Sequence, residues 1–217
     1  MVKILDLFCN QGGASAGYMR YGHVTGVDIS PMREYVGDAF IQGDAIEYLR
    51  EHGSEFDLIH ASPPCQRDAA ITKGTNAHLR SQYPDLYPVT REALEEVGVP
   101  YVIENPAARA DIVLCGEMFG LGVLRHRRFE LGGWKATQPV HKPHRGKVRG
   151  YRHGQYFDGP YVAAYGKGGG KGTTEEIRHA MGIDWVTKRE DLVEMIPPAY
   201  TRFIGDAFVD WKESDGL

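Results

Sequence analysis

The stretch KILDLFCNQGGASAG, residues 3–17, predicts the architecture of this chain. Its first half, residues 3–8, is an apolar run of strand length, and Gly12 and Gly13 follow it. Small residues then continue to about Arg20 and indicate a helix that begins near Ala14. Glycine lets a backbone approach a ligand closely, and a helix N-terminus presents free amides. The stretch therefore predicts a ligand at the turn, although it has neither the GxGxxG spacing nor the lysine of a phosphate-binding loop.

The same alternation of strand and helix continues through the first 130 residues. Strand patterns cover residues 3–8, 23–27, 56–61, 101–104 and 112–114, and helical patterns cover 91–97, a segment from Thr173, and 196–208. We expect an α/β fold with a doubly wound, mostly parallel sheet and helices on both faces. Three parts follow from this division: a catalytic and cofactor-binding core (1–131), a small insert (132–175), and a C-terminal segment that returns to the core (176–217).

The string Ser62-Pro63-Pro64-Cys65-Gln66 follows the buried strand pattern of residues 56–61. Each proline fixes its own φ, so the thiol of Cys65 is held in one direction at the carboxyl end of a strand. Open α/β sheets place their chemistry at this edge. The alternative is a proline-rich turn whose cysteine only packs in the core. Residues 67–90 show no period, and we interpret this long loop as a lid over the thiol.

The composition is that of an ordinary globular protein. The 217 residues are 42% apolar and 25% charged, and three cysteines without framework spacing indicate a reducing compartment. No run approaches the roughly 18 apolar residues of a membrane span. The first residues are read as a strand rather than a signal peptide. We expect a cytoplasmic monomer.

Positive charge gathers in the insert. Between Gly132 and Gly172 there are eight lysines and arginines and one acidic residue, interleaved with aromatic side chains, while the whole chain carries −4. This pattern favours a surface that contacts a polyanion, and a solvated loop is the alternative. His141, His144 and His153 also lie here. Because no cysteine lies within ligand spacing of them, we expect no metal.

Acidic and basic residues follow other predicted strands. Asp28 ends the second strand, where ribose hydroxyls are usually held, and Asp44 follows a third segment. Glu104-Asn105 ends the strand at 101–104 and can reach the same pocket as Cys65; a helix cap or a salt bridge with Arg109 is the alternative. Three arginines surround His126, and strand alternation places Arg125 and Arg127 on one side.

Taken together, these strings resemble the DNA cytosine-5 methyltransferase family, in its short phage and prophage form. Asp6-Leu-Phe-Cys-Asn-Gln-Gly-Gly13 resembles the first cofactor motif, Ser62-Pro-Pro-Cys-Gln66 the nucleophile motif, and Glu104-Asn105 the Glu-Asn-Val motif. Arg125-x-Arg127 resembles the arginine pair of Gln-x-Arg-x-Arg, and Ile196-Pro-Pro198 the last motif. All five occur in family order. Asn10, Val123, Pro106 and residues 193–195 depart from the usual pattern.

The resemblance implies a Rossmann-like core that binds S-adenosyl-L-methionine and methylates carbon 5 of cytosine in double-stranded DNA. It implies Cys65 as nucleophile, Glu104 as hydrogen-bond partner of ring N3, and Arg125 and Arg127 as ligands of base O2. The base is flipped out of the duplex. The implied cofactor contacts are Phe8, Cys9, Asn10, Gln11, Gly12, Gly13, Asp28, Ile29, Asp44, Ala45, Pro63 and Glu194. The implied DNA contacts are Gln66, Arg145, Lys147, Arg149 and Arg152.

Two alternatives remain open at this point. A branch of the family with the same nucleophile motif modifies tRNA, and a catalytically silent relative that only binds DNA is the second. The intact Cys65, Glu104 and arginine pair favour an enzyme. The insert is only about 40 residues long, so it predicts a short recognition sequence, since each good base contact gives roughly 1–3 kcal/mol of discrimination.

Overall fold

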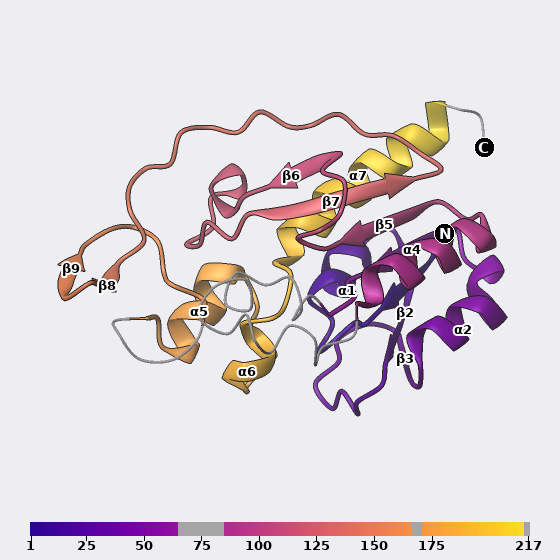
Figure 1. Cartoon of the computed structure of the whole chain (residues 1–217), viewed down its shortest axis with the longest axis horizontal. Coiled ribbons are helices and arrows are strands. Elements are labelled where there is room, and N and C mark those ends of the chain that lie inside the picture. Colours follow the sequence, from indigo (N-terminus) through magenta and orange to yellow (C-terminus); the bar gives the residue numbers. More distant parts are fainter. Residues whose placement is uncertain (65–84, 166–170, 215–217) are drawn as a thin grey trace.

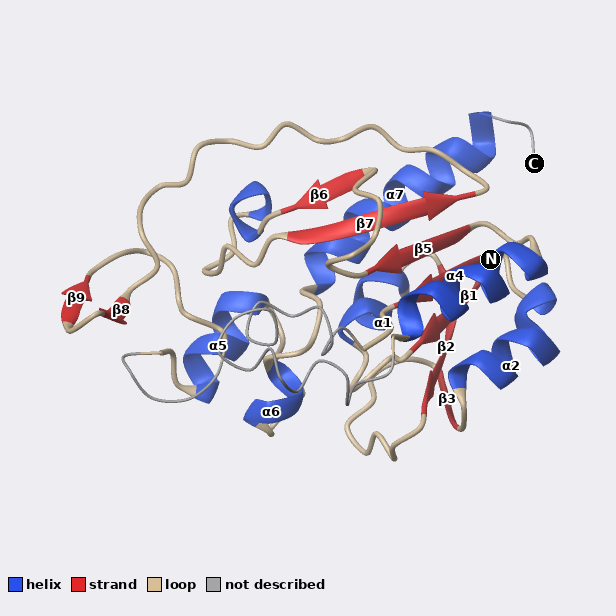
Figure 2. Ribbon diagram, viewed as in Figure 1, coloured by secondary structure: helices blue, strands red, loops and turns tan. Residues whose placement is uncertain are grey.

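A twisted sheet with helices on both faces forms the body of the protein (Figures 1 and 2). The computed structural model describes residues 1–64, 85–165 and 171–214. Within these ranges, seven strands pair in the order β3-β2-β1-β4-β5-β7-β6. Their bounds are β1 Val2–Leu7, β2 Gly22–Asp28, β3 Ala39–Gln42, β4 Leu58–Ala61, β5 Tyr101–Glu104, β6 Ile112–Leu114 and β7 Arg127–Gly132. Neighbours from β3 to β5 are parallel, and β7 runs antiparallel to both β5 and β6.

The strand order reverses between β1 and β4. From β1 the chain builds outward through β2 and β3, and then crosses back to place β4 and β5 on the other side. The last residues of the two central strands, Leu7 and Ala61, are direct partners. Open α/β sheets bind ligands at such a reversal, outside the carboxyl ends of the strands.

Each face of the sheet buries its own apolar cluster. Helices α1 (Gly13–Tyr18) and α7 (Pro198–Ser214) cover one face, where Ile4, Tyr200 and Phe208 pack. Helices α2 (Ala45–His52) and α4 (Leu86–Val97) cover the other, with Leu5 and Leu94 in its core. Adjacent residues of β1 therefore point to opposite faces, as pleating requires. The predicted doubly wound sheet is confirmed.

The predicted elements agree with the structure except near α4. Residues 86–90, which the sequence placed in a long loop, form the first turn and a half of that helix. Pro88 lies in this first turn, where its missing amide has no helical partner to lose. The interpretation of residues 67–84 as a lid lies outside the described residues. Strand β3 and helix α2 were not predicted.

The insert contains little regular structure. A connection from 133 to 149 has no helix or strand and leads to a hairpin of β8 (Gly150–Arg152) and β9 (Gln155–Phe157). Figure 1 shows this hairpin away from the main sheet. Helices α5 (Thr174–Met181) and α6 (Arg189–Leu192) follow and share a third apolar cluster that includes Ile177, Leu192 and Val123. Short 3-10 turns occupy η1 (Gly53–Glu55) and η3 (Gly116–Phe119). Across the described ranges, every helix is too short or too polar to cross a bilayer.

Candidate active site

The turn that carries the predicted nucleophile is clamped on two sides. Ser62 donates its amide to the carbonyl of Leu7 at 3.1 Å, which continues the β1–β4 ladder by one residue. On the other side, the buried Asn105 donates Nδ2 to the carbonyl of Pro63 at 3.2 Å. The chain therefore leaves Pro64 from a fixed position at the carboxyl edge. Cys65 and Gln66 themselves lie outside the described residues.

A series of hydrogen bonds between buried side chains also holds the turn at Ser62. Tyr18 Oη lies 3.0 Å from His60 Nδ1, and His60 Nε2 lies 3.0 Å from Ser62 Oγ. Complete burial lowers the pKa of His60 to about 3, so the imidazole is neutral at physiological pH. Sequence reasoning treated His60 only as part of a strand. The signal for it was a polar residue inside an apolar run, two positions before a serine.

Glu104 pairs with one of the two predicted arginines. Its Oε1 lies 3.1 Å from Arg127 Nε, and the side chains are 14% and 27% exposed. The alternative partner, Arg109, instead forms an ion pair with Asp111 at 2.8 Å. The next element after Glu104 is strand β6, so Glu104 does not cap a helix. The antiparallel pairing of β5 with β7 explains the meeting, because it brings the start of β7 to the end of β5.

Arg125 is held in an unusual conformation. Its φ of 43° lies in the left-handed region, and its guanidinium donates to the carbonyls of Ala164 at 3.1 Å and Met195 at 2.8 Å. Burial and then the neighbouring Arg127 lower the pKa of Arg125, but a guanidinium stays charged at neutral pH. Among the described residues, the buried Nε of Arg125 has no hydrogen-bond partner, whereas the Nε of Arg127 lies against the Glu104 carboxylate without forming a hydrogen bond to it. A buried donor without an acceptor costs about 1–3 kcal/mol, so a ligand oxygen would be stabilised here.

The predicted cofactor turn is strained and is tied to β2. Phe8, Asn10 and Gly12 all have positive φ, at 58°, 48° and 86°. The amide of Asn10 donates to Asp28 Oδ2 at 3.1 Å, and Ser30 donates to Oδ1 at 3.0 Å. The carboxyl ends of β1 and β2 are thereby joined at the sheet edge. Non-glycine residues in this conformation cluster at functional sites.

Residues from the C-terminal segment complete the turn. The side chain of Gln11 donates to Asp191 Oδ2 at 3.0 Å and accepts the amide of Glu34 at 2.9 Å. Trp185 Nε1 donates to the carbonyl of Gln11, and Asn10 Nδ2 donates to the carbonyl of Asp191. Sequence reasoning did not identify Asp191, Trp185 or Glu34, because they are distant in the chain and belong to no motif.

The remaining predicted cofactor contacts border this turn. Asp44 caps α2, since its Oδ1 accepts the amides of Ile46 and Glu47, and Ala45 is the first residue of that helix. Ile29 is a large apolar side chain exposed beside Asp28. Burial, followed by the charge of Asp191, raises the pKa of Glu194. The carboxylates near the turn suit a cationic ligand with an apolar surface, and S-adenosylmethionine is such a molecule.

The predicted DNA contacts are partly committed to internal ion pairs. Arg145 pairs with Glu117 at 3.0 Å, Arg149 pairs with Glu176, and Lys147 lies 4.8 Å from the centre of the Phe157 ring. The side chain of Arg152 lies outside the described residues. A cavity of about 940 Å³ lined by Tyr101, Gly132 and neighbouring residues lies at the opposite edge of the sheet, where β5 begins and β7 ends. It is therefore not the candidate site.

The strand order and the reversal at β1 and β4 define the Rossmann-like fold of S-adenosylmethionine-dependent methyltransferases. The chain is similar to the Entamoeba histolytica methyltransferase EhMeth, with 13% identity, a TM-score of 0.61 and coverage of 97% of this chain and 98% of that one. It is also similar to the Dnmt2 methyltransferase of S. pombe, with 14% identity, the same TM-score and coverage of 96% and 98%. A Spodoptera frugiperda DNMT2 mutant gives 12%, 0.61, 96% and 100%. At these identities the likeness establishes the fold. No protein-family model and no curated protein matches the sequence.

Proposed function

We propose that the protein methylates carbon 5 of cytosine in double-stranded DNA. The observation that carries this proposal is the cluster of Glu104, its ion-pair partner Arg127 and the unpartnered buried Nε of Arg125, at the edge where Asn105 holds Pro63. A cytosine offers the complementary groups, because its O2 is an acceptor and its N3 can share a proton with a carboxyl group. Five family-like motifs contribute to this single edge, in an order that matches the family.

The methyl donor in this proposal is S-adenosyl-L-methionine. The turn at Phe8–Gly13, Asp28 with Ile29, Asp44 with Ala45, Pro63 and Glu194 would hold it. When bound, it supplies an electrophilic methyl group for transfer to carbon 5. The acidic surroundings would stabilise its positive charge, and Asp28 would accept a hydrogen bond from a ribose hydroxyl.

The residues of the chain would activate the base. The Cys65 thiolate forms a bond to carbon 6, and the ring electrons move toward carbon 5, which becomes nucleophilic. Glu104 would hydrogen-bond N3, and Arg127 would contact O2 and stabilise the added negative charge. After methylation, a base removes the carbon 5 proton, the bond between sulfur and carbon 6 breaks, and the aromatic ring returns. The cytosine must leave the base stack to reach these groups.

A covalent trap tests the chemistry directly. A DNA duplex that contains 5-fluorocytosine has no removable proton at carbon 5, so the enzyme remains attached after methyl transfer. We expect a denaturation-resistant adduct with the native protein when S-adenosylmethionine is present, and none with Cys65→Ser. Turnover by the serine variant near the native rate would contradict the assignment of the nucleophile.

The same experiment separates the alternatives. A tRNA that carries 5-fluorocytosine, offered in parallel, would trap an RNA-modifying enzyme instead. A silent relative would bind the DNA without forming an adduct on either nucleic acid. The basic insert favours a polyanion in each case, so the identity of the trapped strand decides between them.

A further inference from the structure

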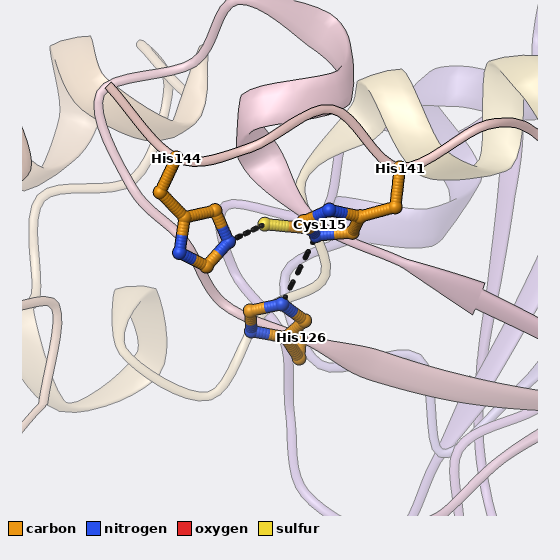
Figure 3. A group of neighbouring side chains, drawn as sticks. All are labelled: Cys115, His126, His141 and His144. Atoms are coloured by element: carbon orange, nitrogen blue, oxygen red, sulfur yellow. Dashed lines mark hydrogen bonds between the residues drawn. The ribbon is translucent and has the colours of Figure 1, made fainter. Parts of the chain in front are cut away.

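Four side chains with metal-binding atoms converge beside the candidate active site (Figure 3). They are Cys115, His126, His141 and His144. The buried Cys115 directly follows β6, and His126 directly precedes β7. The two other histidines come from the 133–149 connection of the insert and are exposed, like His126. The fold therefore assembles the cluster from three separate segments.

The distances within the cluster match the edges of a metal tetrahedron. Cys115 Sγ lies 3.6 Å from His144 Nε2, and His126 Nε2 lies 3.2 Å from His141 Nε2. With Zn–S near 2.3 Å and Zn–N near 2.05 Å, a tetrahedral site has S–N edges of about 3.6 Å and N–N edges of about 3.3 Å. All four ligand atoms lie within 4.8 Å of one another. Small rotations of the exposed imidazole rings close the remaining edges.

We propose that these four residues bind one zinc ion. One thiolate and three imidazoles form a borderline-soft donor set that suits zinc and does not suit magnesium or calcium. Four protein ligands close the coordination shell, so the site is structural and leaves no position for a reacting water. The atoms in contact are the sulfur of Cys115 and the Nε2 atoms of the three histidines, and four such ligand atoms complete a tetrahedral zinc site.

The surroundings of two ligands are already organised. Cys115 caps η3, and its sulfur accepts the backbone amide of Met118. The residue that follows His144 is also held in place: Arg145 donates its amide to Tyr161 Oη at 2.9 Å and forms an ion pair with Glu117. These contacts fix the backbone that carries two of the ligands, and groups around a metal site help to orient its ligands.

The zinc would fasten the insert to the catalytic edge. His126 lies between Arg125 and Arg127, whose guanidiniums belong to the candidate active site. His141 and His144 belong to the otherwise irregular connection that leads to the β8–β9 hairpin. One ion bound by both segments would set the position of the insert relative to the arginine pair. This role depends on the positions of the four ligands and not on the proposed reaction.

Sequence reasoning rejected a metal because it considered only ligands near one another in the chain. His141 and His144 were identified with His153, but His153 lies in the β8–β9 turn and is not part of the cluster. The other two ligands lie far upstream in the sequence. His126 precedes its contact partner His141 by 15 residues, and Cys115 precedes His144 by 29. His153 therefore serves as a matched control.

Metal content of the purified protein tests the proposal. The protein is prepared without a histidine tag, dialysed against metal-free buffer and measured by inductively coupled plasma mass spectrometry. We expect about one zinc per chain for the native protein, His153→Ala and Cys65→Ser, since a structural site holds a single ion. We expect loss of zinc from Cys115→Ser and from His141→Ala combined with His144→Ala. Equal zinc in all variants, or none in the native protein after refolding with zinc, would overturn the proposal.

Cobalt(II) substitution identifies the ligands independently of folding yield. Native protein with cobalt should show the visible bands of a tetrahedral site and a thiolate charge-transfer band in the near ultraviolet. The charge-transfer band should persist in Cys65→Ser and disappear in Cys115→Ser. Its loss in the first variant rather than the second would mean that the metal binds elsewhere. Because Cys65→Ser is inactive under the proposed function, zinc retained there separates failure of one proposal from failure of the other.

Discussion

Arg125 concentrates several unfavourable features in one residue. It has a positive φ, a buried guanidinium and an Nε without a partner among the described residues. Its backbone carbonyl is also fixed, since it accepts the hydroxyl of Tyr200 at 2.9 Å. Phe8 and Asn10 share the positive φ at the same edge of the sheet. Local strain of this kind persists only where the surrounding structure holds it, and here it marks the candidate site.

Glu104 gives the first prediction at the scale of single residues. Glu104→Gln preserves the size of the side chain but removes the acid and its charge beside Arg127. We expect methyl transfer to slow by about 10²–10⁴-fold, the usual contribution of a positioned acid or base. The measurement is single-turnover transfer of a radiolabelled methyl group to DNA. Glu95→Gln, on the exposed side of α4, is the control, and a rate for Glu104→Gln within a few-fold of native would remove Glu104 from the chemistry.

His60 predicts a pH dependence of stability. Its pKa falls from 6.5 to about 3 on folding, so the folded protein excludes a proton that the unfolded chain binds below pH 6.5. The free energy of unfolding therefore loses up to about 1.4 kcal/mol per pH unit as the pH falls from 6.5 toward 3. Above pH 6.5 this contribution is complete.

Urea unfolding of His60→Gln at several pH values isolates that contribution. Glutamine has one donor and one acceptor for Tyr18 and Ser62, but it does not titrate. We expect the variant to be less stable at pH 7 by about 1–2 kcal/mol, for imperfect hydrogen bonds, and the difference to shrink by pH 5. Parallel stability curves for the two proteins would show that folding does not lower the pKa of His60.

At the scale of elements, the contact between α1 and α7 depends on Gly17. A Cβ at this position would lie 2.1 Å from Thr201 Oγ1 and 2.3 Å from the carbonyl of Pro198. Thr201 is itself fixed, because its hydroxyl donates to the carbonyl of Ala14 at 2.8 Å. The two helices therefore pack backbone to backbone, and this contact holds the last motif against the cofactor turn.

Gly17→Ala tests this contact. Alanine favours a helix by about 1 kcal/mol over glycine, yet the overlap with backbone atoms costs about 1–3 kcal/mol or more. We expect a net loss of stability, measured as a lower midpoint of thermal unfolding. Gly43→Ala, which has no atom within 4 Å of its added Cβ, should leave the midpoint unchanged. A Gly17 variant as stable as native would mean that α7 moves aside without cost.

The sequence predicted those elements whose pattern is local. Residues 101–104 and 112–114 are apolar runs bounded by turn residues, and both strands match the structure. Strand β3 (Ala39–Gln42) was missed because it lies at the edge of the sheet, where its side chains are half-buried or exposed and give no pattern of a buried strand. The start of α4 was missed because residues 67–90 show no helical period, and the first turn of the helix contains a proline, which is tolerated there.

The candidate site divides in the same way. Asp28 and Glu104 were predicted because each ends a strand of the parallel part of the sheet, and Arg127 because it begins the antiparallel strand beside Glu104. Asp191 accepts hydrogen bonds from the side chains of Asn10 and Gln11, and the side chain of Asn105 donates to the backbone carbonyl of Pro63. Cys115 and His126 meet His141 and His144 in the folded protein, although strand β7 separates the two pairs in the sequence. No local pattern encodes such meetings.

At the scale of the whole molecule, the proposed function assigns recognition of the sequence context to the insert. Two of its predicted DNA contacts, Arg145 and Arg149, form ion pairs with Glu117 and Glu176. These arginines therefore help to fix the insert, and replacing them would alter its structure as well as its charge. Tyr151 and Tyr156 remain exposed on the β8–β9 hairpin, with ring centres 5.2 Å apart.

The architecture of the insert leads to the last prediction, which concerns specificity. Its described part offers one two-stranded hairpin and no helix between β7 and α5, so few side chains can reach base edges in a groove. Each good contact discriminates by roughly 1–3 kcal/mol, and two or three contacts specify about two to four base pairs. We expect methylation in a short or degenerate context. Bisulfite sequencing of DNA from cells that express the protein measures it, with Cys65→Ser as the control for background.

A strict site of about six or more base pairs would exceed what this hairpin can read, because discrimination of that many positions needs more base contacts than it can present. Such a result would assign recognition to another part of the chain or to a partner protein.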